Sequence, residues 1–244
     1  MNKFKLGVIV NPYAGIGGSV GLKGSDGEDI RAEAFARGAE FRASMRMLRC
    51  LSLLADFKDF IEVVCFGGDM GEIAAREAHL SHRVVGTAQT TPSSPQDTIA
   101  AAKSLVNEQV DVILFAGGDG TARNIADALQ EMNAESQVVL GVPSGVKMHS
   151  GVYAITPEAA GEILICLLKK QLVNVHACEV RDIDEVAFRD GKVKTRLYAS
   201  MFAPVLPQFL QQVKNSGAVQ DEMVKLDIAH YLIDNLVEDI LYVV

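Results

Sequence analysis

The run Val110-Asp-Val-Ile-Leu-Phe-Ala116, followed at once by Gly117-Gly118-Asp119-Gly120-Thr121, decides the fold class of this 244-residue chain. Its apolar residues predict a buried strand, and the glycines predict a tight turn directly after it. Residues 121–132 then show the periodicity of an amphipathic helix. This order favours phosphate binding, because glycine lets the backbone approach an anion and a helix N-terminus offers free N–H groups.

Asp119 is the informative residue of this turn. A carboxylate directed at phosphates would repel them, so it needs another role, either as a contact of Mg²⁺ or as a base for an attacking hydroxyl. The alternative is a tight turn in which the aspartate only caps the helix. The turn by itself leaves both interpretations open.

Short apolar runs alternate with amphipathic segments through the first two-thirds of the chain. We expect strands over residues 6–10, 61–66, 83–85, 110–116 and 138–142, and helices over 41–55, 70–80, 95–107, 121–132 and 159–170. Ser94-Pro95 and Thr156-Pro157 mark two helix starts, each with an N-cap side chain and proline at the first helical position. The alternation predicts an α/β fold, a doubly wound parallel sheet that binds ligands at the carboxyl ends of its strands.

The pattern changes after residue 170. It predicts a strand over 172–180, a hairpin turn at Asp190-Gly191, a loop containing Pro204 and Pro207, a helix over 221–237 and a strand over 240–244. We therefore expect a nucleotide-binding domain over residues 1–170 and a partial, strand-containing second domain over 171–244. The last strand has no turn or polar tail behind it, so we expect the natural protein to be longer.

The net charge of -8 argues against a protein that binds nucleic acid non-specifically or lies on an anionic membrane. No stretch of the sequence reaches the roughly 18–20 apolar residues that span a bilayer. The four cysteines and five histidines show no zinc-ligand spacing, so we expect reduced thiols and no structural metal. We expect a cytoplasmic protein that binds small-molecule nucleotides and forms homo-oligomers.

Three segments carry a family resemblance: the turn at 117–121, the stretch Asn11-Pro-Tyr-Ala-Gly-Ile-Gly-Gly18, and the stretch Gly141-Val-Pro-Ser-Gly-Val-Lys-Met-His-Ser150. Together they resemble the ATP-NAD kinase-like family, within the superfamily of NAD kinase and diacylglycerol kinase catalytic domains. The resemblance covers residues 5 to about 156 well and the remainder more weakly. It implies the fold of the N-terminal domain of those kinases.

The resemblance also implies an activity, in which a phosphoryl group passes from ATP or polyphosphate, with Mg²⁺, to a hydroxyl. The favoured acceptor is the ribose 2′-OH of NAD, and Asp119 is implied to act near that hydroxyl or to contact the metal. The residues expected to line the phosphates or the dinucleotide are Asn11, Gly15, Gly117, Gly118, Gly120, Thr121, Ser144 and Lys147. The alternatives are a solvated surface lysine for Lys147 and a mobile loop for residues 15–27.

The sequence departs from NAD kinases after residue 170, where it lacks their Asn-Glu pair and a later glycine- and threonine-rich turn. This departure concerns the acceptor more than the fold. Two alternatives stay open: a lipid kinase with the same signature, against which the net charge of -8 argues, and a non-catalytic nucleotide-binding protein. Gly67-Gly68-Asp69 repeats the turn in degenerate form, and we expect it to form a pocket rim.

Overall fold

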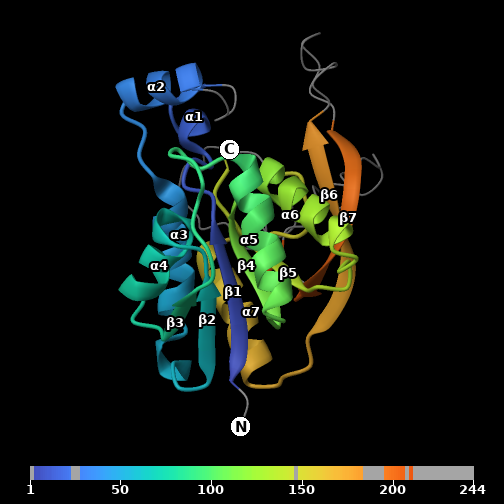
Figure 1. Ribbon diagram of the computed structural model, residues 1–244. Helices are drawn as coiled ribbons and strands as arrows, with labels where there is room; N and C mark the ends of the chain where they lie inside the picture. The colour runs from blue at the N-terminus through green and yellow to red at the C-terminus, as the bar shows by residue number, and fades with distance from the viewer. Residues whose placement is uncertain (1–2, 23–27, 146–147, 184–194, 207–208, 211–244) are drawn as a thin grey trace, which may run out of the picture. The chain divides into compact units, whose positions relative to one another are not determined.

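Five parallel strands form the central sheet of the computed structural model, in the order β3-β2-β1-β4-β5 (Figure 1). The structure describes residues 3–22, 28–145, 148–183, 195–206 and 209–210. The strands are β1 (Phe4–Val10), β2 (Ile61–Cys65), β3 (His82–Val84), β4 (Val112–Gly117) and β5 (Val139–Pro143). Each lies within two residues of its predicted bounds. The strands β1, β2, β4 and β5 are mostly buried and form nearly continuous apolar runs, whereas the edge strand β3 is short and mostly exposed. The predicted fold class is confirmed.

Helices cover both faces of this sheet. One face packs against α3 (Arg42–Ser52), α4 (Glu72–Glu77) and α7 (Pro157–Leu168), and the other packs against α5 (Pro95–Asn107) and α6 (Asp119–Glu131). In β1, Val8 and Val10 point to the first face and Ile9 to the second, because side chains alternate along a strand. The fold is therefore doubly wound.

One predicted helix differs from the observed one, and two observed helices were not predicted. The helix expected over 70–80 is the short α4, preceded by the 3₁₀ turn η2 (Gly68–Met70), because Gly71 has a φ of 147° and interrupts the helix. The segment before α3 contains α1 (Ile16–Ser19) and α2 (Glu28–Ala36), which the sequence pattern did not predict. A 3₁₀ turn, η1 (Ala55–Phe57), follows α3.

A second, two-stranded sheet follows α7. β6 (Asn174–Ile183) pairs antiparallel with β7 (Thr195–Val205). The loop expected around Pro204 is wrong, since Pro204 lies in β7 opposite Val175; a two-stranded sheet has free edges, where the missing N–H of proline is tolerated. The turn predicted at 190–191, the helix at 221–237 and the strand at 240–244 lie outside the described residues.

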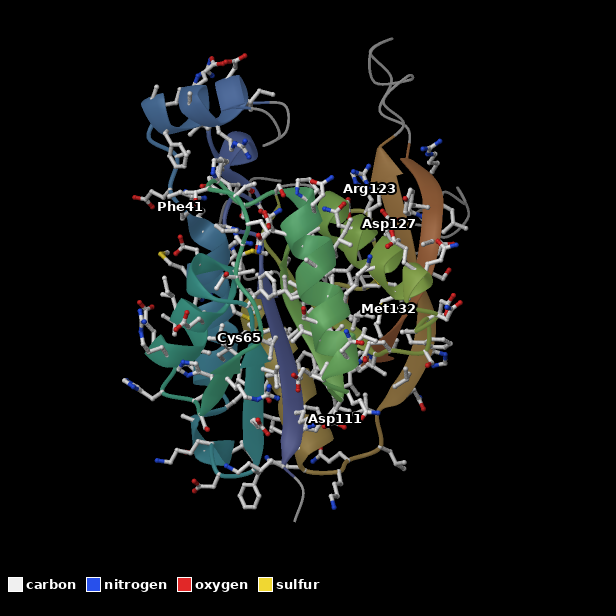
Figure 2. All side chains as sticks on the ribbon, in the orientation of Figure 1. Phe41, Cys65, Asp111, Arg123, Asp127 and Met132 are labelled. Atoms are coloured by element: carbon white, nitrogen blue, oxygen red, sulfur yellow. The ribbon has the colours of Figure 1, made fainter. Side chains whose placement is uncertain are left out.

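Polar contacts connect the two-stranded sheet to α6. The Tyr198 hydroxyl donates to Asp127 Oδ1 at 2.7 Å, and the Arg123 guanidinium lies 5.9 Å from the Tyr198 ring centroid. Figure 2 shows Arg123 and Asp127 on the side of α6 that faces β6 and β7. Residue contacts divide the chain into the units Met1–Val213 and Lys214–Val244, and the described residues all belong to the first. The domain boundary near residue 170 stays a prediction.

The structure also describes the environment of the four thiols and the length and hydropathy of the helices. Cys50 and Cys65 are buried, Cys166 and Cys178 are half-buried, and all four are free of disulfides. Burial and, to a lesser extent, the nearby Glu72 carboxylate raise the pKa of the Cys65 thiol to about 12, so this thiol stays protonated. None of the helices formed by described residues has the length and apolar character needed to cross a bilayer.

Candidate functional site

The strand order of the central sheet reverses between β1 and β4, which lie side by side. In a parallel sheet the crevice beyond the carboxyl ends of two such strands is the usual position for a ligand. Asn11 follows β1 directly and spans the crevice, where its Nδ2 donates to Thr121 Oγ1 at 3.0 Å. Its Oδ1 accepts the Tyr13 N–H at 3.2 Å, so both ends of the amide are held.

The glycine turn after β4 is compact on one side and open on the other. A Cβ on Gly117 would overlap the Thr121 side chain, whose Oγ1 lies 3.4 Å from the Gly118 nitrogen that donates to it. A Cβ on Gly118 or on Gly120 would meet no atom within 4 Å. The first turn of α6 therefore presents accessible backbone toward the crevice, as an anion-binding helix start requires.

The Asp119 carboxylate holds the loop that follows β5. Its Oδ1 accepts the Ser150 N–H at 3.0 Å, and its Oδ2 accepts the His149 N–H at 2.9 Å and lies 3.2 Å from His149 Nδ1. The residue is 9% exposed. A carboxylate in the first turn of a helix is also favoured by the helix dipole. Asp119 thus joins the start of α6 to residues thirty positions later.

The end of β5 lies against the same turn. The Ser144 N–H donates to the Gly117 carbonyl at 3.0 Å, and the Ser144 side chain is buried. Gly15 has a φ of 79°, and a Cβ there would overlap the Ser144 carbonyl oxygen, so only glycine allows this approach. Lys147 lies outside the described residues. Of the nine residues that the sequence singled out, the other eight thus meet at one edge of the sheet.

The comparison with protein families agrees with this arrangement. The model of the ATP-NAD kinase N-terminal domain matches residues 6–172, which include every singled-out residue and the central sheet except the first two residues of β1. The chain belongs to this family. A search among curated proteins finds no match.

Within this ATP-NAD kinase domain, Tyr153 is a residue that the sequence reasoning missed. Its hydroxyl donates to the Gly118 carbonyl at 2.6 Å, and its ring packs edge-on against Phe115 with centroids 5.2 Å apart. The ring fills the space above Gly141, where a Cβ would overlap it. Burial and the nearby Asp119 charge raise the pKa of Tyr153, so its hydroxyl stays a donor. No local pattern marks a contact between residues 35 positions apart.

The described side chains could contact a metal only together with the phosphates of a bound nucleotide. The described residues contain no group of three His, Cys, Asp or Glu side chains that would form a metal cage. Mg²⁺ in nucleotide sites is usually bound by one or two carboxylates together with the phosphates. Asp119 is the carboxylate at this turn, and a carboxylate has about four lone-pair sites, three of which have donors here.

Proposed function

We propose that this chain is a small-molecule kinase domain that transfers a phosphoryl group from ATP or polyphosphate to a hydroxyl, with the ribose 2′-OH of NAD as the acceptor. Membership in the ATP-NAD kinase family supports phosphoryl transfer. The observation that carries the proposal is the convergence of Asn11, the turn at 117–121 and Ser144 beyond the carboxyl ends of β1, β4 and β5. The backbone N–H groups of such a turn can hold phosphates even in an acidic chain.

The open face of the turn is the proposed phosphate contact. Gly118 and Gly120 leave room for a phosphoryl oxygen to approach the backbone, and the α6 dipole favours the negative charge. Gly15 and Ser144 form the adjoining wall. Positioning and electrostatic stabilisation supply most of the catalysis in phosphoryl transfer, so a rigid cradle of this kind is the main requirement.

Asp119 is the proposed catalytic residue. Its fourth lone-pair site has no partner among the residues that the structure describes, and it would accept the proton of the acceptor hydroxyl or contact Mg²⁺, which would neutralise the charge that develops on the phosphates. His149 Nδ1, 3.2 Å away, is the weakest of its three partners and the one that a substrate would displace. The two backbone N–H groups of residues 149 and 150 would keep the carboxylate oriented during the reaction.

Lys147 is the proposed side-chain partner of the phosphates. The prediction rests on its place shortly after β5. Lys147→Ala should weaken nucleotide binding more at low salt than at high salt, because screening reduces a purely electrostatic contribution. Nucleotide titrations at two ionic strengths measure this difference, and equal losses at both would identify Lys147 as a surface lysine.

One observation favours a second function, that of a nucleotide-binding protein without turnover. Asp119 already accepts three hydrogen bonds in this structure, as a purely structural carboxylate would. A coupled assay separates the two functions: the chain is incubated with ATP, Mg²⁺ and NAD, and NADP is detected with an NADP-dependent dehydrogenase. We expect NADP to form; saturable NAD binding without NADP would establish the non-catalytic function. A cytoplasmic location and self-association stay predictions.

A further inference from the structure

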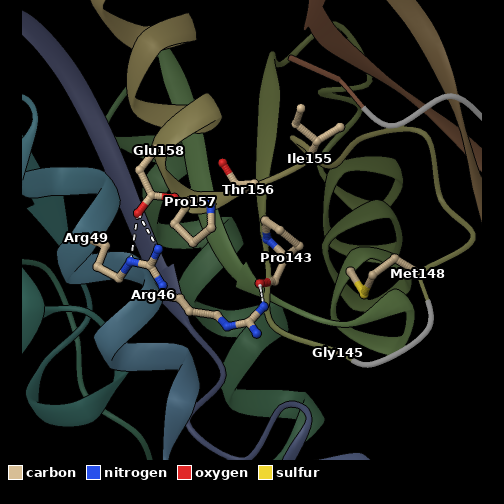
Figure 3. A pocket seen from close by; sticks show the side chains of 9 residues that line it. All are labelled: Arg46, Arg49, Pro143, Gly145, Met148, Ile155, Thr156, Pro157 and Glu158. Carbon is tan, nitrogen blue, oxygen red and sulfur yellow. Dashed lines mark hydrogen bonds and ion pairs between the residues drawn. The ribbon is translucent and has the colours of Figure 1, made fainter. Parts of the chain in front are cut away.

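A cavity of about 390 Å³ lies beside the glycine turn, between α3, the end of β5 and the start of α7 (Figure 3). This volume is within the range of about 300–1,000 Å³ that is usual for small-molecule sites. Gly145 belongs to its lining, and a Cβ built on Gly145 would lie 3.7 Å from the Gly118 Cα. The cavity therefore shares a wall with the proposed phosphate turn, although none of the residues of that turn lines it.

Arginines of α3 give one side of the cavity a positive charge. Arg49 Nε and Nη2 lie 2.7 and 2.6 Å from Glu158 Oε1, so these two charges largely cancel. Arg46 donates from Nη1 to the Pro143 carbonyl at 2.6 Å, as Figure 3 shows. A guanidinium has five N–H donors, so this bond leaves others for a ligand. The lining thus carries a net charge of +1 in a chain of net charge -8.

The surroundings of Arg46 oppose its charge. Its pKa lies below the ordinary value because half-burial disfavours the charged form, and because Arg42 and Arg49 repel it from the preceding and following turns of the same helix. Glu158 offsets this only in part. A bound anion would relieve the repulsion, and a phosphate dianion would relieve it more than a singly charged carboxylate.

The start of α7 does not supply the donors for such an anion. Thr156 Oγ1 accepts the Ala159 N–H at 3.1 Å, while the Thr156 hydroxyl and the Glu158 N–H are already bonded to the Glu158 carboxylate. Pro157 has no N–H to offer. Recognition of an anion here falls to the guanidinium of Arg46, which also matches the geometry of phosphate oxygens.

The opposite side of the cavity is apolar. Figure 3 shows Met148 and Ile155 on the side away from the arginines, and Ile155 is 48% exposed. A cavity that is cationic on one side and apolar on the other fits a molecule with the same division. We propose that this cavity binds the phosphate group of a small organic ligand, with Arg46 as the phosphate contact and Met148 and Ile155 against the ligand's apolar part.

Titration of the full chain with three probes tests the site. Phenyl phosphate carries both features, inorganic phosphate only the charge, and benzyl alcohol only the ring. We expect phenyl phosphate to bind most tightly, and Arg46→Gln to weaken it about 10- to 100-fold, the loss expected for a charge-assisted hydrogen bond. Arg83→Gln is the control: Arg83 is an exposed residue of β3 that pairs with Glu108 and does not line the cavity, so its loss should leave probe binding unchanged. Ile155→Ala should weaken phenyl phosphate but not inorganic phosphate.

Equal binding by wild type and Arg46→Gln, or an absence of saturable phenyl phosphate binding, would overturn the proposal. Benzoate binding as tightly as phenyl phosphate would overturn the preference for phosphate. If Arg46→Gln does not fold, arginine modification by phenylglyoxal, read by peptide mass spectrometry on the wild-type chain, replaces it. Phenyl phosphate should then protect Arg46 but not Arg83, and equal modification of Arg46 with and without ligand would refute the site.

Competition with NAD identifies the source of the phosphate. Displacement of phenyl phosphate by NAD would assign the cavity to the dinucleotide, whereas simultaneous binding would assign it to a separate phosphorylated ligand; both outcomes keep Arg46 as the phosphate contact. The site is independent of turnover. Asp119→Asn should retain phenyl phosphate binding. If the wild-type chain forms no NADP in the coupled assay but binds phenyl phosphate through Arg46, the proposed kinase activity is refuted and the cavity site stands.

Discussion

The chain contains two glycine–glycine–aspartate turns, Gly67–Asp69 after β2 and Gly117–Asp119 at the end of β4, and their hydrogen-bond partners differ. After β2, the Gly68 N–H donates to Glu72 Oε2 at 2.8 Å, and Asp69 is exposed. After β4, the Asp119 carboxylate is buried and bonds to the loop after β5, while a 13-residue helix begins at once. In the first turn a backbone N–H bonds to a carboxylate of the same segment, Glu72. In the second turn the carboxylate bonds to residues of a different segment, the loop after β5.

This difference follows from the positions of the two turns in the sheet. β2 lies beside β3, away from the reversal of strand order, and the carbonyl of Gly86, two residues after β3, accepts the Gly67 N–H at 2.7 Å. β4 lies at the reversal, so Asn11 and Ser144 reach its turn from either side. A glycine turn therefore becomes a ligand site only where neighbouring strand ends leave a crevice. The degenerate turn has the local sequence but not the position.

The largest expected effect is on turnover. Asp119→Asn should reduce the rate of phosphoryl transfer by ~10²–10⁴-fold, the range for loss of a general base or an equivalent charged group. Asp69→Asn, the same change in the other turn, should leave the rate within about twofold. Rates from the coupled assay, with circular dichroism to verify folding, test the pair. A similar loss in both variants, or in neither, would remove the distinction between the turns.

The next effect is on the stability of the fold, at the loop that precedes α5. Asp97 is 2% exposed and accepts bonds from Gln89 N–H, the Thr90 hydroxyl, and the Ser94 N–H and hydroxyl. Burial raises the pKa of its carboxyl, but these donors lower it by more, so the net pKa lies below the usual range. We expect Asp97→Asn to cost about 2–3 kcal/mol in the free energy of unfolding at neutral pH, as loss of hydrogen bonds to a charged group does.

The pH dependence checks the cause of that loss. A carboxyl whose folded pKa is depressed stabilises the fold above its unfolded pKa of about 3.9, and this contribution disappears as the pH falls toward the folded value. The difference in unfolding free energy between wild type and Asp97→Asn should therefore shrink below about pH 4. Denaturant titrations across pH 2–7 measure it, with Asp69→Asn as the exposed control. A constant difference would mean that the carboxylate charge is not the cause.

Two adjacent glycines distinguish packing from ligand access at the second turn. Gly117→Ala should cost about 1–3 kcal/mol, because the added methyl overlaps Thr121 in a filled space. Gly118→Ala should cost less than about 1 kcal/mol, since its φ of -116° suits alanine and its Cβ position is open. If that open space receives a phosphate, Gly118→Ala should nevertheless weaken nucleotide binding. Thermal unfolding and nucleotide titration of both variants separate the two effects.

The smallest effect concerns the support behind the turn. Tyr153→Phe removes the bond to the Gly118 carbonyl and should cost about 1 kcal/mol, because that carbonyl keeps the Thr121 and Ala122 N–H groups as donors. Tyr198→Phe removes an exposed bond to Asp127 and should cost less than about 0.5 kcal/mol. Chemical denaturation of the two variants tests this order, and a larger loss for Tyr198→Phe would contradict it.

The sequence by itself determined the elements of the sheet and the position of the candidate site. The strands β1, β2, β4 and β5 are predicted because their burial leaves an apolar run in the sequence, while the edge strand β3 is short and mostly exposed. α5 lies at its predicted bounds because Ser94 and Pro95 mark its start. The family resemblance singled out Asn11, Ser144 and the turn at 117–121, and each of them directly follows or ends a strand. In a parallel sheet all strands end at one edge, so local patterns suffice to bring such residues near one another.

Only the tertiary structure decided which of these residues touch and what surrounds them. The strand order places β1 beside β4, so Asn11 and Ser144 contact the turn at 117–121, whereas the Gly68 N–H of the other turn bonds to Glu72 of its own segment. The partners of Asp119, the Tyr153 hydroxyl on Gly118 and the Arg46 cavity all join residues that lie 30 to 97 positions apart. Such contacts depend on how helices and strands pack in three dimensions. The hydrophobic periodicity of an element indicates which of its faces is buried but not which element packs against that face.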